Sequence, residues 1–115
     1  MAQWEFVDWL LIWILETSHF EFVWDVGNLT KSARKHGVSP ADVEAVFRSG
    51  KALPLGTQIR PAVPEERLGI VGPSLSGKLL QIAFVLRDGR VRVISARTAH
   101  RKERKRYEEI LRKIS

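Results

Sequence analysis

The sequence contains no cysteine, and this absence excludes several kinds of site at once. Without thiols the chain has no disulfide framework, no thiolate zinc site and no cysteine nucleophile. The three histidines, at positions 19, 36 and 100, are scattered along the chain and do not suggest a histidine metal site. The sequence therefore predicts neither a metal nor a cofactor.

Long hydrophobic segments are missing as well. The unbroken apolar run at residues 9–15 is only seven residues long, and Glu5, Asp8 and Glu16 bracket it closely. A transmembrane helix needs about 20 mostly apolar residues. A secretory signal would carry a basic start and a small-residue cleavage site, and neither is present. We therefore expect no membrane association and a cytoplasmic protein.

Basic residues are absent from the first part of the chain and abundant in the last part. Residues 1–23 carry a formal charge of −4, whereas residues 87–115 carry eleven basic side chains against four acidic ones. The whole chain of 115 residues has a net charge of +6 and is 44% hydrophobic. This composition predicts a single folded domain rather than a disordered chain. The charge asymmetry points to an acidic partner, either RNA or an acidic protein.

The N-terminal apolar run predicts a helix. In that helix the three acidic residues fall on one narrow stripe, and apolar side chains, including Trp4, cover the rest of the surface. A helix this apolar is expected to be buried, either against its own domain or across a homodimer. We place an N-terminal extension at residues 1–19 and the main domain at residues 20–115.

The remainder predicts an α+β domain, in which a basic helix follows an antiparallel meander. The expected elements are a strand at Phe20–Trp24, a helix at 26–35, a second helix from Pro40, strands at 66–72, 79–86 and 91–95, and a helix at 98–114. Ser39 is expected to cap the second helix, and Asp88-Gly89 is a strong hairpin signal. Three prolines and a glycine interrupt residues 51–64, so we expect a loop there with at most a short strand.

Several motifs resemble those of the BrnT toxins of bacterial type II toxin–antitoxin systems. They are Phe-Val-Trp-Asp at 22–25, Arg-Lys-His-Gly-Val-Ser at 34–39, Glu-Glu-Arg-Leu-Gly-Ile-Val-Gly at 65–72, Arg-Val-Ile-Ser-Ala-Arg at 92–97, and the stretch 101–108 ending in Tyr-Glu. The resemblance covers about residues 20–110. It implies a RelE-like compact fold, a ribonuclease activity that halts translation, and neutralisation by a BrnA-type antitoxin encoded alongside.

Cleavage of RNA without a metal uses the ribose 2′-hydroxyl as nucleophile. It needs a base for that hydroxyl, cations for the phosphorane charge and an acid for the leaving oxygen. Arginine suits the cationic role because its planar fork binds phosphate with two hydrogen bonds and stays charged. The candidate catalytic residues are Arg67, Arg92, Arg97, His36 and Glu66. Strand alternation places Arg92 and Arg97 on one face only if their strand ends near Ala96.

Each candidate also has a structural interpretation. An arginine can form a surface salt bridge, Glu66 can pair with a neighbouring arginine, and His36 can contact the carbonyl groups that end a helix. RNA contacts are expected from Lys35, Arg101, Arg104 and Tyr107. The tyrosine can instead pack on the domain. The basic run 101–106 fits an RNA backbone, an acidic antitoxin surface or a plain solvated helix.

The sequence departs from the family pattern at a few positions. Val26 stands where the family has proline, and Asn28 and Ser32 replace a lysine and an asparagine of the first helix. The segment Gly56–Pro64 carries Arg60 but lacks the acidic residues and the histidine of the family. Two hypotheses therefore remain open. One is a metal-independent ribonuclease toxin, and the other is a catalytically degenerate module that acts with its antitoxin in promoter repression.

Overall fold

The computed structural model describes residues 3–25, 27 and 36–114. Its elements, in chain order, are β1 (Gln3–Glu5), α1 (Asp8–Glu16), α3 (Pro40–Arg48), β2 (Leu53–Arg60), β3 (Leu68–Pro73), β4 (Leu79–Arg87), β5 (Arg90–Thr98) and α4 (Arg101–Ile114). The described strands form one antiparallel sheet in the order β1-β2-β3-β4-β5. The predicted α+β class is therefore confirmed, and the RelE-like assignment stays a prediction. Apart from Gly27, the helix expected at 26–35 lies outside the described residues.

Local sequence explains the second predicted helix and the last hairpin, which are both confirmed. The hydroxyl of Ser39 accepts a hydrogen bond from the backbone N–H of Asp42 at 3.2 Å, and the Asp42 carboxylate accepts one from the Ser39 N–H at 3.2 Å. This reciprocal capping box, with Pro40 in the first turn, fixes where α3 begins. Between β4 and β5, Asp88 and Gly89 both have positive φ angles, 53° and 75°, which a tight two-residue hairpin requires.

The expectation of a loop over residues 51–64 is wrong, because β2 occupies most of that segment. Within the described chain, β1 pairs with β2 only from Thr57 to Arg60, whereas β3 also pairs with the beginning of β2. Pro54 therefore lies on a stretch of β2 with a partner strand on one side. A proline, which has no N–H to donate, is tolerated at such an edge.

The N-terminal segment begins with a strand of the sheet. The expectation of a single helix that includes Trp4 is therefore wrong. β1 is a strand paired with β2, and α1 begins only at Asp8. Gly56 has a φ of +124°, and a Cβ atom there would lie 1.9 Å from the backbone oxygen of Glu5. A Cβ atom on Gly69 would lie 2.8 Å from the Trp4 ring. These two glycines therefore make room for β1 against its own sheet.

In place of the strand expected at Phe20–Trp24, the structure has an isolated β-bridge. Phe22 forms an isolated parallel bridge with Val91 at the outer edge of β5, supported by two backbone hydrogen bonds of 2.8 Å. The aromatic residues of this segment pack inward. Phe20 is buried, and its ring centre lies 5.6 Å from that of Phe47 in α3. Packing against the core, rather than a strand ladder, therefore holds this segment.

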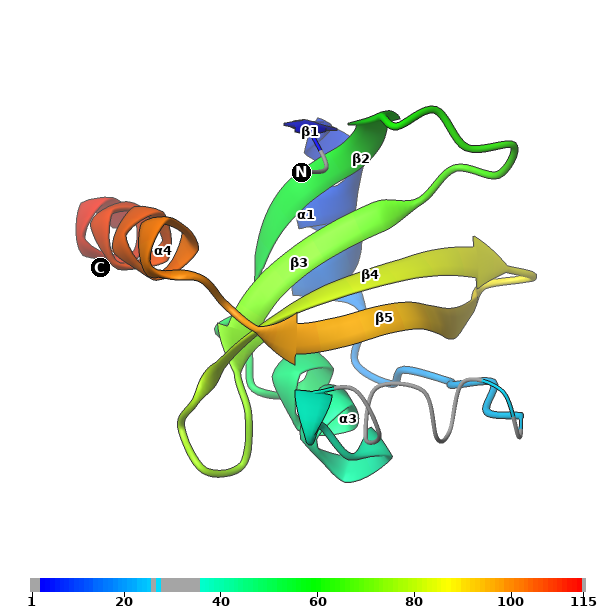
Figure 1. Ribbon diagram of the computed structural model, residues 1–115, viewed down its shortest axis with the longest axis horizontal. Helices are drawn as coiled ribbons and strands as arrows, with labels where there is room; N and C mark the ends of the chain where they lie inside the picture. The colour runs from blue at the N-terminus through cyan, green and yellow to red at the C-terminus, as the bar shows by residue number, and fades with distance from the viewer. Residues whose placement is uncertain (1–2, 26, 28–35, 115) are drawn as a thin grey trace.

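The hydrophobic core lies on one face of the sheet, called here the core face, which α1 and α3 cover (Figure 1). The strands contribute Leu68, Ile70, Leu80, Ile82, Phe84, Val91, Val93 and Ala96, and the two helices contribute Leu10, Ile14, Val43, Val46 and Phe47. The opposite, open face carries α4 at one end only, where Tyr107 and Leu111 pack near Val71. No helix in the described part of the chain has the length and apolar character needed to span a bilayer.

Candidate active site

An irregularity in β5 brings two of the predicted arginines onto the open face. The register between β4 and β5 shifts at Ile94, which is an extra residue on β5. Such a β-bulge reverses the alternation of side chains beyond it. Arg92 and Arg97 are five residues apart and therefore share one face, even though β5 continues past Ala96.

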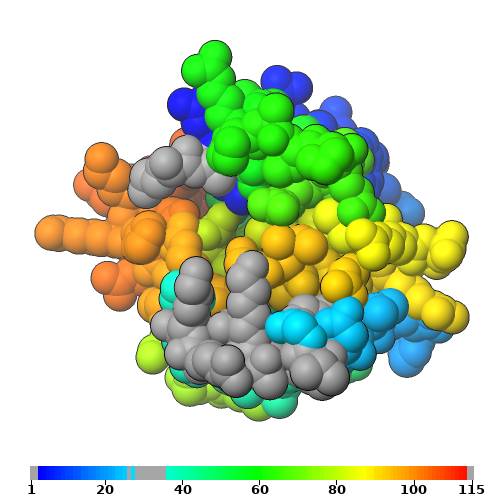
Figure 2. All heavy atoms as spheres, turned by 45° about the vertical axis from the view of Figure 1, so that its right-hand side comes forward, coloured from blue at the N-terminus to red at the C-terminus, as the bar shows by residue number. Residues whose placement is uncertain are grey.

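The open face is hollowed beside α4 into a cleft of about 600 Å³. Figure 2 shows this hollow between β2, drawn in green, and the orange residues of β5 and the start of α4. The described polar side chains that line it are Gln58, Arg67, Gln81, Ser95, Arg97, His100, Glu103 and Arg106. Three arginines against one glutamate make these walls electropositive, which favours a polyanion as the ligand.

Arg67 reaches the cleft from the residue that precedes β3. Its carbonyl oxygen accepts a hydrogen bond from the backbone N–H of Gln58 at 2.8 Å, so pairing with β2 holds its backbone in place. The Arg67 side chain is half-buried and forms no ion pair within the described residues. Its fork of N–H donors is therefore suited to binding a phosphate.

Arg97 is held by a carboxylate from the first turn of α4. Its two terminal nitrogens, Nη1 and Nη2, each donate to one oxygen of Glu103 at 2.9 Å. Nη1 also donates to the carbonyl oxygen of Thr98 at 3.1 Å. The two side chains are only 24% and 18% exposed, so this ion pair is shielded from water far more than a surface pair. The strand and the helix thereby fix the direction of the guanidinium.

Glu103 also organises the beginning of α4. Its carboxylate accepts a hydrogen bond from the backbone N–H of His100 at 2.7 Å, as a residue in the first helical turn commonly does. Burial acts to raise the pKa of Glu103, but hydrogen bonds from Arg97 and His100 outweigh burial and hold that pKa below its ordinary value of 4.5. Glu103 is therefore ionised at neutral pH and fixes His100 at the edge of the cleft.

Arg92 and Glu66, both predicted to be catalytic, are absent from the described lining of the cleft. Arg92 forms an ion pair with Asp25 instead. Glu66 is exposed, and it is the neighbouring Glu65 that pairs with an arginine, accepting hydrogen bonds of 2.9 and 2.8 Å from Arg87. The catalytic roles of Arg92 and Glu66 stay predictions.

The described basic candidates other than Arg67 and Arg97 are absent from the described lining of the cleft. His36 is exposed next to Gly37, whose φ of +66° is typical of the glycine that follows a helix. Lys35 lies outside the described residues. Arg101 and Arg104 are exposed on α4, whose first half is largely solvated, as its charge predicts. The structure therefore brings Arg67 and Arg97 into one cleft and leaves His36, Arg101 and Arg104 outside its described lining.

Tyr107 packs on the domain, which agrees with the structural alternative given for it, and its contact with RNA stays a prediction. It is 6% exposed, and its hydroxyl donates to the carbonyl oxygen of Lys51 at 2.6 Å. Burial raises the pKa of the phenol above its ordinary value. Tyr107 therefore attaches α4 to the chain just before β2.

Replacing Tyr107 with phenylalanine is expected to lower the free energy of unfolding by about 1 kcal/mol, because a hydrogen bond to the main chain is lost while the ring still fits. Thermal or urea unfolding measures this loss. RNA binding should be unchanged in the same variant. Weaker RNA binding at unchanged stability would assign the hydroxyl to the ligand instead.

Sequence reasoning missed several residues of the cleft. Gln81 is buried at 7% exposure, and Ser95 lies between the predicted Arg92 and Arg97 on β5. His100 was not among the candidate site residues; it is exposed and lines the cleft. Ser95 and His100 are close to Arg97 in sequence, whereas no signal in the sequence indicated Gln81.

Comparison with known proteins shows which family this chain belongs to. A search of the curated proteins gave no significant match. A family model described as the ribonuclease toxin BrnT of type II toxin–antitoxin systems matches residues 24–103, more than half of the chain. The matched segment includes Arg67, Arg97 and Glu103 of the cleft. The chain therefore belongs to the BrnT family of ribonuclease toxins of type II toxin–antitoxin systems.

Proposed function

We propose that this chain is an endoribonuclease whose active site is the cleft on the open face of the sheet. One observation carries the proposal: Arg67, which immediately precedes β3, and Arg97 of β5 line the same electropositive cleft. Two arginines on adjoining walls can hold a phosphodiester between them and neutralise the charge that builds up when the phosphorus is attacked. The nucleophile is the 2′-hydroxyl of the RNA, and the reaction needs no metal.

The residues around these arginines supply the other roles. We assign Arg67 and the Nε side of Arg97 to the phosphate, because Glu103 binds the two terminal nitrogens of Arg97. Glu103 is a positioning residue, since it acts on the substrate only through Arg97. His100 contributes an imidazole to the described lining of the cleft, and an imidazole can both accept and donate a proton, as transfer to or from a ribose oxygen requires.

The rest of the RNA is expected to follow α4. Arg101 and Arg104 are exposed beside the cleft, and Arg106 lines it. Contacts of this kind go to the phosphate backbone, carry no sequence preference and weaken steeply as the salt concentration rises. The proposal therefore predicts salt-sensitive binding with little discrimination between RNA sequences through this helix.

The biological setting follows from the family. We propose that cleavage of RNA inhibits translation in the cytoplasm and that a BrnA-type antitoxin neutralises the chain. An acidic surface on that antitoxin would complement the basic residues of the cleft and of α4.

The proposal is tested by inducible expression of the wild-type chain beside a variant with both Arg67→Ala and Arg97→Ala. Growth and total RNA are followed, and the amount of soluble protein is measured in both cultures. Growth arrest with loss of RNA in the wild type alone supports the proposal. Intact RNA with abundant soluble wild-type protein would contradict it.

One observation favours the alternative, a catalytically degenerate module that acts with its antitoxin in promoter repression. The terminal nitrogens of Arg97 are already bound by Glu103, so this arginine can serve the fold without binding substrate. The alternative predicts no growth arrest from the chain alone. It also predicts antitoxin binding that survives the double arginine variant.

The ion pair between Glu103 and Arg97 should make stability depend on pH. The pKa of Glu103 is lower in the folded chain than its ordinary value of 4.5. The stabilisation is therefore fully present above pH 4.5 and is lost as the pH falls through the lower, folded-state pKa. Glu103→Gln is expected to have a lower Tm than the wild type at pH 7 and to approach the wild type in acid.

The matched control is Glu65→Gln, which breaks a second bidentate arginine pair of the described chain. Glu65 and Arg87 are 44% and 55% exposed, so solvent screening should make the effect of that substitution smaller. Thermal unfolding of the three proteins from neutral to acid pH makes the comparison. A Tm difference for Glu103→Gln that does not change with pH would contradict the assigned ionisation.

A further inference from the structure

The part of the chain that precedes the family match exposes an unusually apolar helix. Ile12 is 51% exposed and Leu15 is 69% exposed on α1, and Phe6, just before the helix, is 53% exposed. Single apolar side chains on a surface are ordinary, but a contiguous group of large ones marks an interaction site. α1 buries Leu10 and Ile14 in its own core and leaves these others uncovered.

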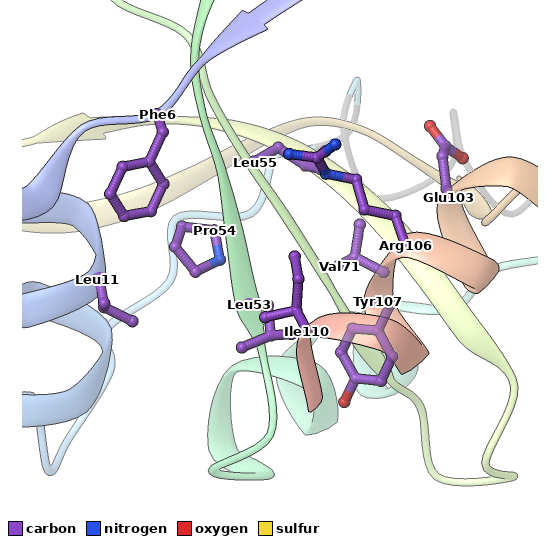
Figure 3. Close-up of a pocket in the computed structure, with 10 residues that line it drawn as sticks. All are labelled: Phe6, Leu11, Leu53, Pro54, Leu55, Val71, Glu103, Arg106, Tyr107 and Ile110. Carbon is purple, nitrogen blue, oxygen red and sulfur yellow. The ribbon is translucent and has the colours of Figure 1, made fainter. Parts of the chain in front are cut away.

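Phe6 also lines an apolar groove that runs from α1 to α4, and Leu15 lies one helical turn beyond Leu11, the residue of α1 that lines this groove. The groove has a volume of about 340 Å³, and Phe6, Leu11, Pro54, Leu55 and Ile110 are among its lining residues. In Figure 3, Phe6 and Leu11 point into the groove from one side, Pro54 lies on its floor, and Ile110 enters from the opposite side. Figure 3 also shows β2 running between the two helices. The groove and the exposed side of α1 therefore form one continuous face, called here the α1–α4 face.

Charges of opposite sign flank this face. Asp8 and Glu16 are exposed on α1, and the first 23 residues contain no lysine or arginine. By helical spacing Asp8, Ile12 and Glu16 share one stripe. The other helix, α4, carries seven basic residues against three acidic ones, and it contributes both Arg106 and Glu103 to the groove. The face is therefore acidic at one side, apolar in the middle and basic at the other.

We propose that the α1–α4 face binds a second copy of this chain. A two-fold axis through the groove would place the acidic, apolar α1 of each copy against the groove and the basic α4 of the other. Interfaces of this kind require a patch that complements itself, and this face contains both halves of such a pair. An apolar centre with a charged rim is the usual composition of a protein interface. The inference does not depend on RNA cleavage.

RNA is a poorer occupant of this face. The middle of the groove is apolar, and acidic side chains on α1 repel a phosphate backbone. A bilayer surface is disfavoured for a related reason, because helices that lie on anionic membranes carry basic residues on their polar side.

Sedimentation velocity of the full wild-type chain at concentrations between about 1 and 100 µM tests the proposal. This range detects dimers whose dissociation constant is micromolar. A monomer–dimer equilibrium is expected. Leu15→Glu should raise the dissociation constant about tenfold or more, because it puts a charge on the exposed apolar side of α1. Leu75→Glu is the matched control: Leu75 is 75% exposed on the turn between β3 and β4, away from the face, so its change should stay within about twofold.

Ile12→Glu provides an independent second variant, and the Tm of each variant establishes that it is folded. A wild-type chain that stays monomeric at every concentration would overturn the proposal. So would a dimer that Leu15→Glu and Ile12→Glu leave intact, or one that Leu75→Glu weakens equally. Co-sedimentation of a monomeric wild type with phosphatidylglycerol vesicles, lost in Leu15→Glu, would assign the face to a membrane.

Discussion

Arg67→Ala is expected to slow RNA cleavage by about 10²–10³-fold while leaving the fold intact. Removing one preorganised donor that stabilises transition-state charge commonly has an effect of this size. Arg67 lies on the wall of the cleft and forms no ion pair within the described part of the chain, so its loss removes charge without leaving a carboxylate unpaired there. Single-turnover cleavage of a labelled RNA measures the rate, and thermal unfolding measures stability.

Two further variants sharpen that measurement. Arg67→Lys keeps the charge but loses the planar fork, so we expect an intermediate rate. Arg87→Ala removes an arginine that pairs with Glu65 and is not part of the described cleft lining, and it should cleave RNA at the wild-type rate. Equal rates for Arg67→Ala and the wild type, or equal losses at Arg67 and Arg87, would place the reaction elsewhere.

Gly56→Ala is expected to have the largest effect on stability, about 3 kcal/mol or more. The φ of +124° disfavours any side chain, and the new Cβ would meet the backbone oxygen of Glu5 at 1.9 Å. Positive φ alone costs about 1–2 kcal/mol, and forcing atoms into a packed site costs about 1–3 kcal/mol more. Because Glu5 belongs to β1, the clash should push the N-terminal segment away from the sheet.

The control is Gly77→Ala, in which the glycine also has a positive φ, +85°, but has open space around its Cβ position. That variant should lose only the conformational part, about 1–2 kcal/mol. Thermal unfolding compares the two, with a fall in Tm of about 10 °C or more expected for Gly56→Ala. Hydrogen exchange should show faster exchange of residues 3–16 in Gly56→Ala only. Identical behaviour of the two variants would mean that β1 does not lie against Gly56 in solution.

Local patterns in the sequence were sufficient for much of the fold. The capping box at Ser39 and Asp42 and the Asp88-Gly89 turn depend on neighbouring residues alone, and both are found as expected. The strands predicted at 66–72, 79–86 and 91–95 are likewise found as β3, β4 and β5, with shifted ends. The chemistry of arginine, together with positions on or just after predicted strands, made Arg67 and Arg97 candidates for phosphate binding.

The pairing of distant segments could not be predicted in the same way. Prolines in residues 51–64 suggest a loop, yet β2 tolerates Pro54 because β1 does not reach that far along the strand. The apolar N-terminal run predicts a helix that includes Trp4, yet the ring of Trp4 lies against Gly69 in β3. In both cases the deciding contact joins residues far apart in the sequence, and no local pattern records it.

By itself the sequence determined the α+β class, the family, the basic C-terminal helix and the arginines suited to phosphate. Only the tertiary structure decided which of those arginines share a site. A single extra residue at Ile94 turns Arg97 to the same face as Arg92, and the first turn of α4 brings Glu103 onto Arg97. A bulge and a helix docking across a sheet are both set by packing over the whole domain, so residue spacing along one strand cannot reveal them.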